Sequence, residues 1–285
     1  AANIPFILSG ASLIPLERII AENPAAWFQA YIPSDRDRIG PLVERVARAG
    51  YATLVVTVDV PVSANRENNV RNGFTLPLRP TVRLALDGLT HPRWLLGTAL
   101  RTLRTSGMPH LENMGATRGL PIVSPDAERD YGKRDALNWD DIAWIRERWR
   151  GKLVIKGVLI AEDARRARQV GLDAIIVSNH GGRQLDGATA SLRALPEVIP
   201  EAGEMTVMLD SGVRRGTDVL KALALGASSV FIGRPFLFAA AIAGEAGVGH
   251  AINLLSLEID RDLALLGCND LASLGPGFLT RVPGR

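Results

Sequence analysis

The chain repeats one pattern: a short apolar segment, an amphipathic segment of helical period, a glycine, and then the next apolar segment. The apolar segments read as strands, and most of them are continuously apolar, as parallel strands buried on both faces should be. We expect seven strands, over Pro5–Ser9, Trp27–Ile32, Thr53–Asp59, Lys152–Val158, Ala174–His180, Thr206–Ser211 and Ser229–Gly233. This alternation indicates an α/β protein, either a (β/α) barrel or a doubly wound parallel sheet.

The helical segments have one apolar face and recognisable ends. Helices are expected over Asp37–Ala49, Asn138–Trp149, Ala161–Val170 and Thr217–Leu225. In the first of these, Ile39, Leu42 and Val46 fall on one face, and a glycine stops the helix. In the second, Asn138 and Asp141 have the spacing of an N-terminal cap.

The spacing of the strands favours the barrel. The last four strands start 22, 32 and 23 residues apart, which leaves room for one helix each, whereas 99 residues separate the starts at Thr53 and Lys152. The long interval predicts an insertion at about 67–137. A closed barrel of this type needs eight strands, so we expect a (β/α)₈ TIM barrel that lacks its first strand in this chain. We therefore expect a single domain over 1–285, and a natural protein with a further segment upstream of Ala1.

Composition narrows the class of protein. The chain has 285 residues, 47% of them hydrophobic, which suffices for a large core and argues against disorder. The single Cys268 excludes a disulfide scaffold. A formal net charge of +3 is small, so we expect anionic small molecules or an anionic surface as partners and no nucleic acid. No metal site is expected, and charges interrupt every long apolar run, which excludes a polytopic membrane protein.

Two glycine-containing loops follow the last two strands. In barrels these positions often bind phosphate, through backbone N–H groups and a helix N-terminus. Gly212 and Gly233 permit close approach of the backbone, and Arg214 and Arg234 supply positive charge. The alternative is a pair of ordinary turns with solvated arginines.

The densest polar cluster runs from Ser178 to Asp186. His180 lies at a strand end, followed by two glycines and then Arg183, which together resemble a general base beside an anion clamp. Asp210, at the end of the next strand, could orient the imidazole. Lys156, near the end of another strand, is either a reactive lysine, a fixed positive charge beside an anionic cofactor, or part of a structural ion pair.

These segments resemble the FMN-dependent 2-hydroxy acid oxidases and dehydrogenases. The motifs in which the resemblance lies are Trp27–Tyr31, Thr57–Asp59 with Arg66 downstream, Val154–Gly157, Val177–Asp186, Leu209–Gly216 and Phe231–Pro235. They occur in the same order over nearly the whole chain. The stretch Leu86–Trp94 and the tail Ile259–Leu274 look most like the membrane-associated mandelate and L-lactate dehydrogenases.

The resemblance implies a role for each matching residue. His180 would take the substrate hydroxyl proton with support from Asp210, Arg66 and Arg183 would bind the substrate carboxylate, and Tyr31 would hydrogen-bond near the substrate oxygens. Lys156 would lie beside the N1–C2 carbonyl edge of the flavin. The cofactor-binding residues would be Ser9, Gln29, Thr57, Lys156, Ser178, Asp210, Gly212, Arg214, Gly233 and Arg234.

The resulting expectation is an FMN-dependent L-2-hydroxy acid dehydrogenase that makes a 2-keto acid and reduces a quinone or another respiratory acceptor. One alternative is an oxidase that uses O₂ and makes H₂O₂. The others are another phosphate-binding barrel, such as a flavin-dependent isomerase or a nucleotide dehydrogenase, and a catalytically dead barrel fragment with a binding role. The resemblance also implies a homo-oligomer, a tetramer.

The insertion bears on the electron acceptor. It carries many leucines and Trp94 among Arg79, Arg83, Arg93, Arg101 and Arg104. It is either a helical lid over the barrel mouth or a segment that lies in the headgroup region of an anionic membrane. The second interpretation predicts a cytoplasmic enzyme, peripheral on the inner face of the cytoplasmic membrane.

Overall fold

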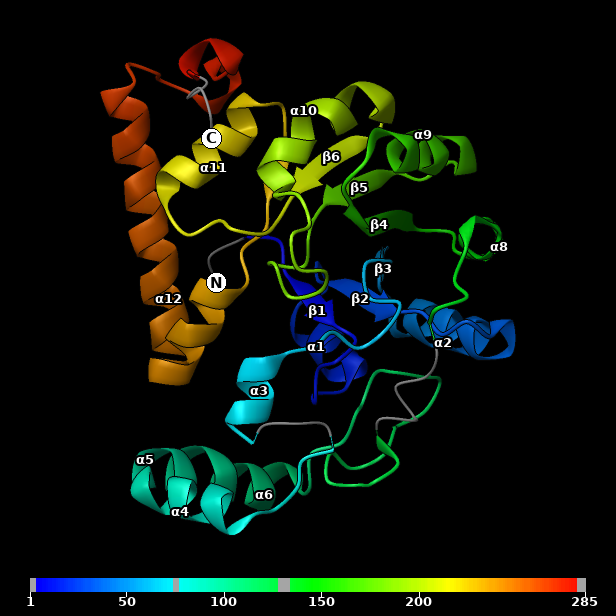
Figure 1. The fold of residues 1–285 in the computed structure, drawn as a ribbon, viewed down its shortest axis with the longest axis vertical. Helices are drawn as coiled ribbons and strands as arrows, with labels where there is room; N and C mark the ends of the chain where they lie inside the picture. Colours follow the sequence, from blue (N-terminus) through cyan, green and yellow to red (C-terminus); the bar gives the residue numbers. More distant parts are fainter. Residues whose placement is uncertain (1–3, 74–76, 128–133, 281–285) are drawn as a thin grey trace. The chain divides into compact units, whose positions relative to one another are not determined.

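The computed structural model describes residues 4–73, 77–127 and 134–280, which form two compact units. One unit spans Pro5–Gly151, and the other spans Lys152–Arg285 together with Ala1–Ile4. Both contain parallel strands joined by helices, as the sequence pattern predicts (Figure 1). The single-domain expectation stays a prediction.

The unit Pro5–Gly151 opens with three strands that pair in chain order. They are β1 (Ile7–Ser9), β2 (Trp27–Tyr31) and β3 (Thr53–Thr57). All pairs are parallel, with Ser9 opposite Gln29 and Tyr31 opposite Thr57. The strands carry a fully buried core that includes Phe28 and Leu54.

Two helices connect these strands, α1 (Leu16–Glu22) and α2 (Arg36–Ala49). The side chain of Asp35 caps α2 by accepting from the N–H of Asp37, and Gly50 ends it at a φ of 97°, a conformation in which glycine is favoured. The sequence analysis did not predict α1.

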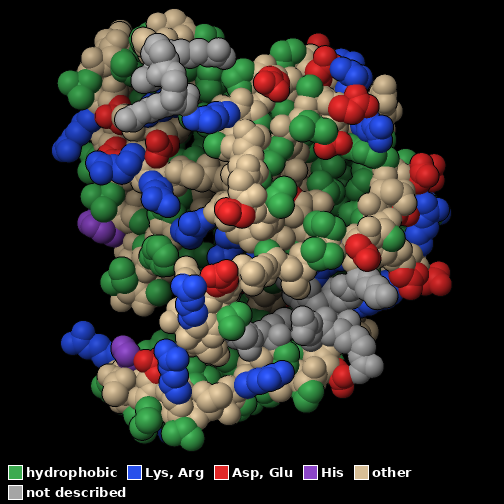
Figure 2. Space-filling view, viewed as in Figure 1, with side chains coloured by type: hydrophobic (Ala, Val, Ile, Leu, Met, Phe, Trp, Pro, Cys, Tyr) green, Lys and Arg blue, Asp and Glu red, His purple; other side chains and the backbone are tan. Residues whose placement is uncertain are grey.

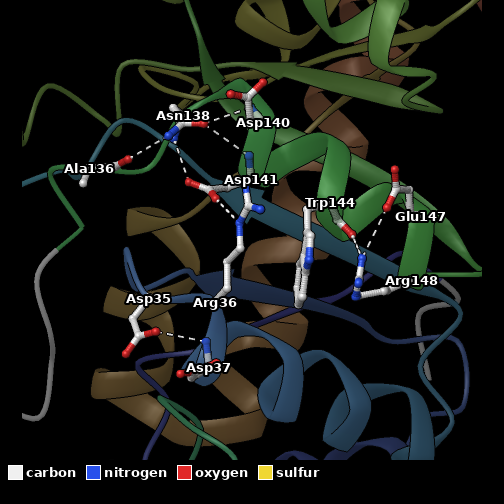
Figure 3. Close-up of polar contacts among 10 residues, drawn as sticks. All are labelled: Asp35, Arg36, Asp37, Ala136, Asn138, Asp140, Asp141, Trp144, Glu147 and Arg148. Atoms are coloured by element: carbon white, nitrogen blue, oxygen red, sulfur yellow. Dashed lines mark hydrogen bonds and ion pairs between the residues drawn. The ribbon is translucent and has the colours of Figure 1, made fainter.

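The insertion forms a series of short helices and then α8. They are α3 (Glu67–Arg71), α4 (Val82–Thr90), α5 (Pro92–Trp94), a π-helical stretch (Leu95–Leu100), α6 (Arg101–Ser106) and α8 (Trp139–Arg148). The expected cap of α8 is confirmed, because the Asn138 and Asp141 side chains and backbones pair reciprocally. Figure 3 shows that Asp141 also accepts from Arg36 of α2 at 2.8 Å, and that Arg148 lies over the Trp144 ring.

The unit that begins at Lys152 alternates strands and helices with great regularity. The strands are β4 (Lys152–Val158), β5 (Ala174–Val177), β6 (Thr206–Leu209) and β7 (Ser229–Val230), paired in parallel in chain order. The helices are α9 (Ala161–Val170), α10 (Ser191–Ala202), α11 (Gly216–Ala224) and α12 (Arg234–Leu265), followed by short 3₁₀ turns over Leu271–Ser273 and Pro276–Phe278. Helices α9 and α10 pack against each other and against the strands (Figure 1).

Six of the seven predicted strands are shorter than expected. β1 starts two residues later, β2 ends one residue earlier, and β3, β5, β6 and β7 end two or three residues earlier. Asp59, His180, Ser211 and Gly233 lie beyond the last paired residue of β3, β5, β6 and β7. These residues belong to loops that leave the sheet.

Helix α12 is long, apolar and exposed. It bends at Ala243 and Gly244, whose backbone angles are not helical. Among the described helices it is the one with the length and composition to cross a membrane, and none of the apolar window is buried. Its mix of small residues and glycines has no clear helical period, which is why the sequence analysis did not predict it.

Candidate active site

In the unit Pro5–Gly151, three polar side chains form a chain of hydrogen bonds from the end of β1, across the middle of β2, to the end of β3. Ser9 Oγ donates to Gln29 Oε1 at 3.0 Å, and Gln29 Nε2 donates to Thr57 Oγ1 at 2.8 Å. Gln29 and Thr57 are buried. Gly10 permits this packing, since a Cβ there would lie 2.9 Å from the Gln29 carbonyl oxygen. The three residues predicted to bind a cofactor in this unit are thus brought together.

This chain of bonds retains donor capacity for a ligand. An amide nitrogen has two N–H groups, and Gln29 uses one of them on Thr57. Thr57 Oγ1 accepts that bond, so its own O–H is directed elsewhere. Such donors match the carbonyl and ring-nitrogen acceptors of a flavin pyrimidine ring. The described residues of this unit therefore fit one edge of FMN.

Tyr31 and Arg66 are the predicted substrate-binding residues of this unit. Tyr31 is the last residue of β2 and packs against a buried cluster of Leu111, Met114 and Ala127. Arg66 directly precedes α3 and is half-buried. Arg134, a residue that the sequence analysis did not single out, lies with its guanidinium carbon 5.0 Å from the centre of the Tyr31 ring.

In the unit that begins at Lys152, the predicted lysine is the centre of a polar cluster. Lys156 Nζ donates to Ser178 Oγ at 2.8 Å and pairs with Asp210 Oδ2 at 3.0 Å. Gly157, at a φ of 110°, accompanies an irregularity in the β4–β5 register directly after Lys156. Such a bulge changes the direction of a strand end. An ammonium has three donors, so these two contacts among the described residues leave one for a ligand carbonyl.

The loop that carries His180 has an unusual backbone. Of the described non-glycine residues, His180 and Ser211 are the two with positive φ, at 57° and 79°. Non-glycine residues rarely adopt this conformation, and it concentrates at functional sites. Hydrogen bonds hold the loop: the N–H of His180 donates to Ser178 Oγ at 3.1 Å, and the N–H of Gly181 donates to Ser211 Oγ at 2.8 Å.

Ser211 links this loop to Asp210. Its hydroxyl accepts from Gly181 and donates to Asp210 Oδ1 at 2.9 Å. Asp210 is therefore held by a serine on one oxygen and by Lys156 on the other. The ion pair is one of the alternatives that the sequence left open for Lys156. Support of His180 by Asp210 stays a prediction.

The arginines of this unit lie around the same loops. The Arg234 side chain donates to the carbonyl of Gly181, so it reaches the His180 loop from the start of α12. Arg183 is exposed and follows the two glycines. Arg183 is thus near His180 in the sequence, and Arg234 reaches the same loop through its contact with Gly181. An anion-binding role beside His180 requires such positions.

The start of α12 is the better candidate for a phosphate site. At α11 the backbone N–H groups of Arg214 and Arg215 both donate to Asp218, and that of Gly216 donates to Glu258 at 2.8 Å. The bond from Gly216 is the main reason why the pKa of Glu258 is lowered. These carboxylates already satisfy the start of α11. The start of α12, after Gly233, has no such side-chain cap within the part of the chain that the structure describes. Pro235 has no N–H, and the N–H groups of Phe236 and Leu237 donate to the Gly233 carbonyl, so a phosphate there would bind to the N–H groups before Pro235.

The structure thus groups the predicted residues into two sets, one in each unit. Ser9, Gln29 and Thr57 form the first, and Lys156, Ser178 and Asp210 form the second. Ser211 and Arg134 were not predicted from the sequence as site residues. The Asp-Ser-Gly turn was a usable signal for Ser211, whereas Arg134 is one of many arginines in the insertion. Among the described residues there is no group of three or more possible metal ligands.

Comparison with known proteins gives independent evidence of the family to which the chain is related. Residues 1–281 match the family model described as FMN-dependent dehydrogenase. The chain is 40% identical to the (S)-mandelate dehydrogenase of Pseudomonas putida, over 98% of this chain and 69% of that protein. It is 42% identical to an L-lactate dehydrogenase of Xanthomonas euvesicatoria pv. vesicatoria, over 99% of this chain and 72% of that protein. A crystal structure described as the monotopic membrane protein (S)-mandelate dehydrogenase matches with a TM-score of 0.87 and 40% identity, over 98% of this chain and 73% of that one.

Proposed function

Because this chain belongs to the family of FMN-dependent dehydrogenases, we propose that it oxidises an L-2-hydroxy acid of the lactate or mandelate type to the 2-keto acid and passes the electrons to a membrane quinone. The family establishes an FMN-dependent 2-hydroxy acid dehydrogenase with the TIM-barrel fold. We propose in addition the substrate, the electron acceptor and the role of each residue.

We assign the cofactor to the two polar sets described above. Gln29, Thr57 and Ser9 would hold the flavin ring through their remaining donors, and Lys156 with Ser178 would face its N1–C2 edge. Gly212, Arg214, Gly233 and Arg234 would hold the phosphate, and the backbone N–H groups that precede Pro235 would contribute to it. When bound, FMN accepts the two electrons that leave the substrate carbon.

The remaining residues act on the substrate. Arg66 and Arg183 bind its carboxylate, because a guanidinium can pair with both oxygens at once. Tyr31 donates a hydrogen bond to a substrate oxygen. His180, in its neutral form, takes the hydroxyl proton on an imidazole nitrogen, and the carboxylate of Asp210 favours the protonated imidazole that results.

The observation that carries the proposal is the His180 loop. Its left-handed backbone is maintained by hydrogen bonds to Ser178 and Ser211, which also contact Lys156 and Asp210. A base held in an unfavourable conformation by residues that contact the other candidates is typical of an active site.

The test is anaerobic reduction of the holoenzyme by L-lactate and L-mandelate in His180→Ala. We expect FMN to stay bound and its reduction to slow by ~10²–10⁴-fold, the usual contribution of a general base. The matched control is His250→Ala on the exposed side of α12, which should reduce at the normal rate. Normal reduction in His180→Ala would overturn the assignment.

The proposed acceptor rests on the surface of the insertion. We define the interfacial patch as the exposed apolar and basic side chains of α4 to α6. They are Val82, Leu86, Leu89, Trp94, Leu96 and Leu103 together with Arg83, Arg93, Arg101 and Arg104. Figure 2 shows apolar and basic side chains mixed in this region. This composition fits a helical segment that lies in the headgroup region of an anionic membrane.

Membrane docking would bring the enzyme to a lipid-soluble quinone and place it, as a peripheral protein, on the inner face of the cytoplasmic membrane. The experiment compares turnover with ubiquinone in anionic vesicles against turnover with dissolved O₂. Faster turnover with quinone is expected. Efficient turnover with O₂ and release of H₂O₂ would instead establish an oxidase. A protein that binds no flavin would overturn the proposed activity and favour the catalytically dead fragment. The resemblance also leads us to propose a homotetramer, which the mass in solution checks.

A further inference from the structure

Arg134 is a buried charged residue to which the proposed mechanism gives no role. It is 6% exposed, and its guanidinium carbon lies 5.0 Å from the centre of the Tyr31 ring. Removing a guanidinium from water is unfavourable unless its surroundings compensate. The face of an aromatic ring offers such compensation, because its negative quadrupole attracts a cation.

The other contacts of Tyr31 come from a firmly held segment. Its ring packs against the buried cluster of Leu111, Met114 and Ala127, with Ile122 beside them. Next to this cluster Asn113, which is 1% exposed, accepts from the N–H of Leu16 at 2.8 Å.

Arg45 fixes the same segment from α2. Its Nη1 donates to the carbonyl oxygens of Glu112 and Gly115 at 2.9 and 3.0 Å. These hydrogen bonds hold the segment that forms the apolar wall next to Tyr31. Tyr31 therefore has an apolar contact with this segment and a cation–π contact with Arg134.

On the basis of the substrate role proposed for Tyr31, we propose that Arg134 is a positioning residue for it. The guanidinium holds the ring of Tyr31 in one orientation, and its charge makes the phenolic O–H a stronger donor to an anionic substrate. Because Arg134 acts through Tyr31, its contribution should disappear when the hydroxyl is absent. A merely structural arginine would not behave in this way.

A double-mutant cycle tests this dependence. The variants are Arg134→Met, Tyr31→Phe and the combination, measured by anaerobic titration with a 2-hydroxy acid that reduces the flavin of the unmodified enzyme. We expect each single variant to bind substrate about tenfold more weakly, as loss of one hydrogen bond to a charged group predicts. The double variant should be no weaker than Tyr31→Phe. Multiplicative losses would overturn the proposal, since they would show that Arg134 acts independently of the hydroxyl.

Two further variants sharpen the result. Arg134→Lys keeps the charge and loses the planar contact, so it should recover part of the affinity. Arg148→Met removes an arginine that lies 3.8 Å from the centre of the Trp144 ring (Figure 3), and it should leave substrate affinity unchanged. An equal loss in Arg148→Met would count against a specific role for Arg134.

Fluorine NMR provides a readout that does not depend on activity. The chain has three tyrosines, so 3-fluorotyrosine labelling gives few signals, and Tyr31→Phe identifies the signal of Tyr31 by its loss. We expect Arg134→Met to shift this resonance and to leave that of Tyr51 in place. An unmoved resonance overturns the inference. A moved resonance supports the contact even if no 2-hydroxy acid reduces the enzyme, in which case the proposed function alone has failed.

Discussion

The basic side chains of the interfacial patch predict how strongly the protein binds anionic vesicles. Arg101 and Arg104 are both exposed on α6, and we expect the double substitution to glutamine to weaken binding to anionic vesicles. A basic side chain near an anionic leaflet contributes about 1 kcal/mol. The loss of two therefore amounts to about 2 kcal/mol, or roughly a 30-fold lower partition coefficient.

The assay is co-sedimentation with large vesicles that contain phosphatidylserine, at low salt. The matched control is Arg48→Gln with Arg193→Gln, two exposed arginines of α2 and α10 that remove the same charge from other surfaces. We expect the control to bind like the unmodified protein. Equal weakening in both pairs would show that net charge governs binding, and would exclude the interfacial patch as the binding surface.

The apolar part of the patch should respond differently to salt. Leu89→Ser removes an exposed leucine from α4. Its effect should persist at high salt, because burial of apolar surface is not screened. The arginine effect should shrink as salt rises. If the two variants show the same salt dependence, the helices do not lie in the interface as proposed.

Three further predictions concern the site and its support. Replacing Arg66 or Arg183 by lysine should weaken substrate binding by about tenfold to a hundredfold, because lysine cannot form two parallel hydrogen bonds to the substrate carboxylate. Substrate affinity is measured by titration of the flavin absorbance. Unchanged affinity in both variants would place the substrate carboxylate elsewhere. Gly10→Ala should destabilise the fold by about 1–3 kcal/mol and weaken FMN binding, because the new Cβ would press on the Gln29 carbonyl oxygen. Denaturant unfolding measures the loss of stability, and Gly97→Ala, whose Cβ would have open space around it, is the control. The hydrogen bond from Arg45 lowers the pKa of Glu17 below 4.5. The stabilisation from this ion pair is therefore complete above pH 4.5 and is lost as the pH falls through the folded-state pKa of Glu17. Glu17→Gln should remove this part of the acid denaturation curve, and an unchanged curve would contradict the prediction.

The sequence was most informative where the local pattern and tertiary structure agree. β4 and α9 were predicted with their observed bounds, and the cap at Asn138 was predicted from its spacing. In these elements the apolar period, the stop glycine and the cap all point to one structure. The strand ends at His180 and Ser211 were placed too late, because their left-handed backbone depends on hydrogen bonds made by distant residues.

Other features could not be derived from local patterns. Helix α10 contains Pro196 and Pro200, and proline disfavours the interior of a helix, so the local sequence does not predict this helix. Burial of Leu195 and Val198 stabilises it in the fold. The Lys156–Asp210 pair joins residues that are far apart in the sequence. The contact of Arg134 with Tyr31 is similar, because nothing in the composition of the insertion distinguishes one arginine from the others.

We propose that this chain oxidises an L-2-hydroxy acid with its bound FMN. The most direct measurement mixes the FMN-loaded protein anaerobically with the L and D forms of lactate, mandelate and longer 2-hydroxy acids, while the flavin absorbance is followed. We predict that at least one L acid bleaches the flavin, that its D form does not, and that His180→Ala bleaches at least a hundredfold more slowly. A protein that binds FMN fully and is bleached by no 2-hydroxy acid of either hand would contradict the account.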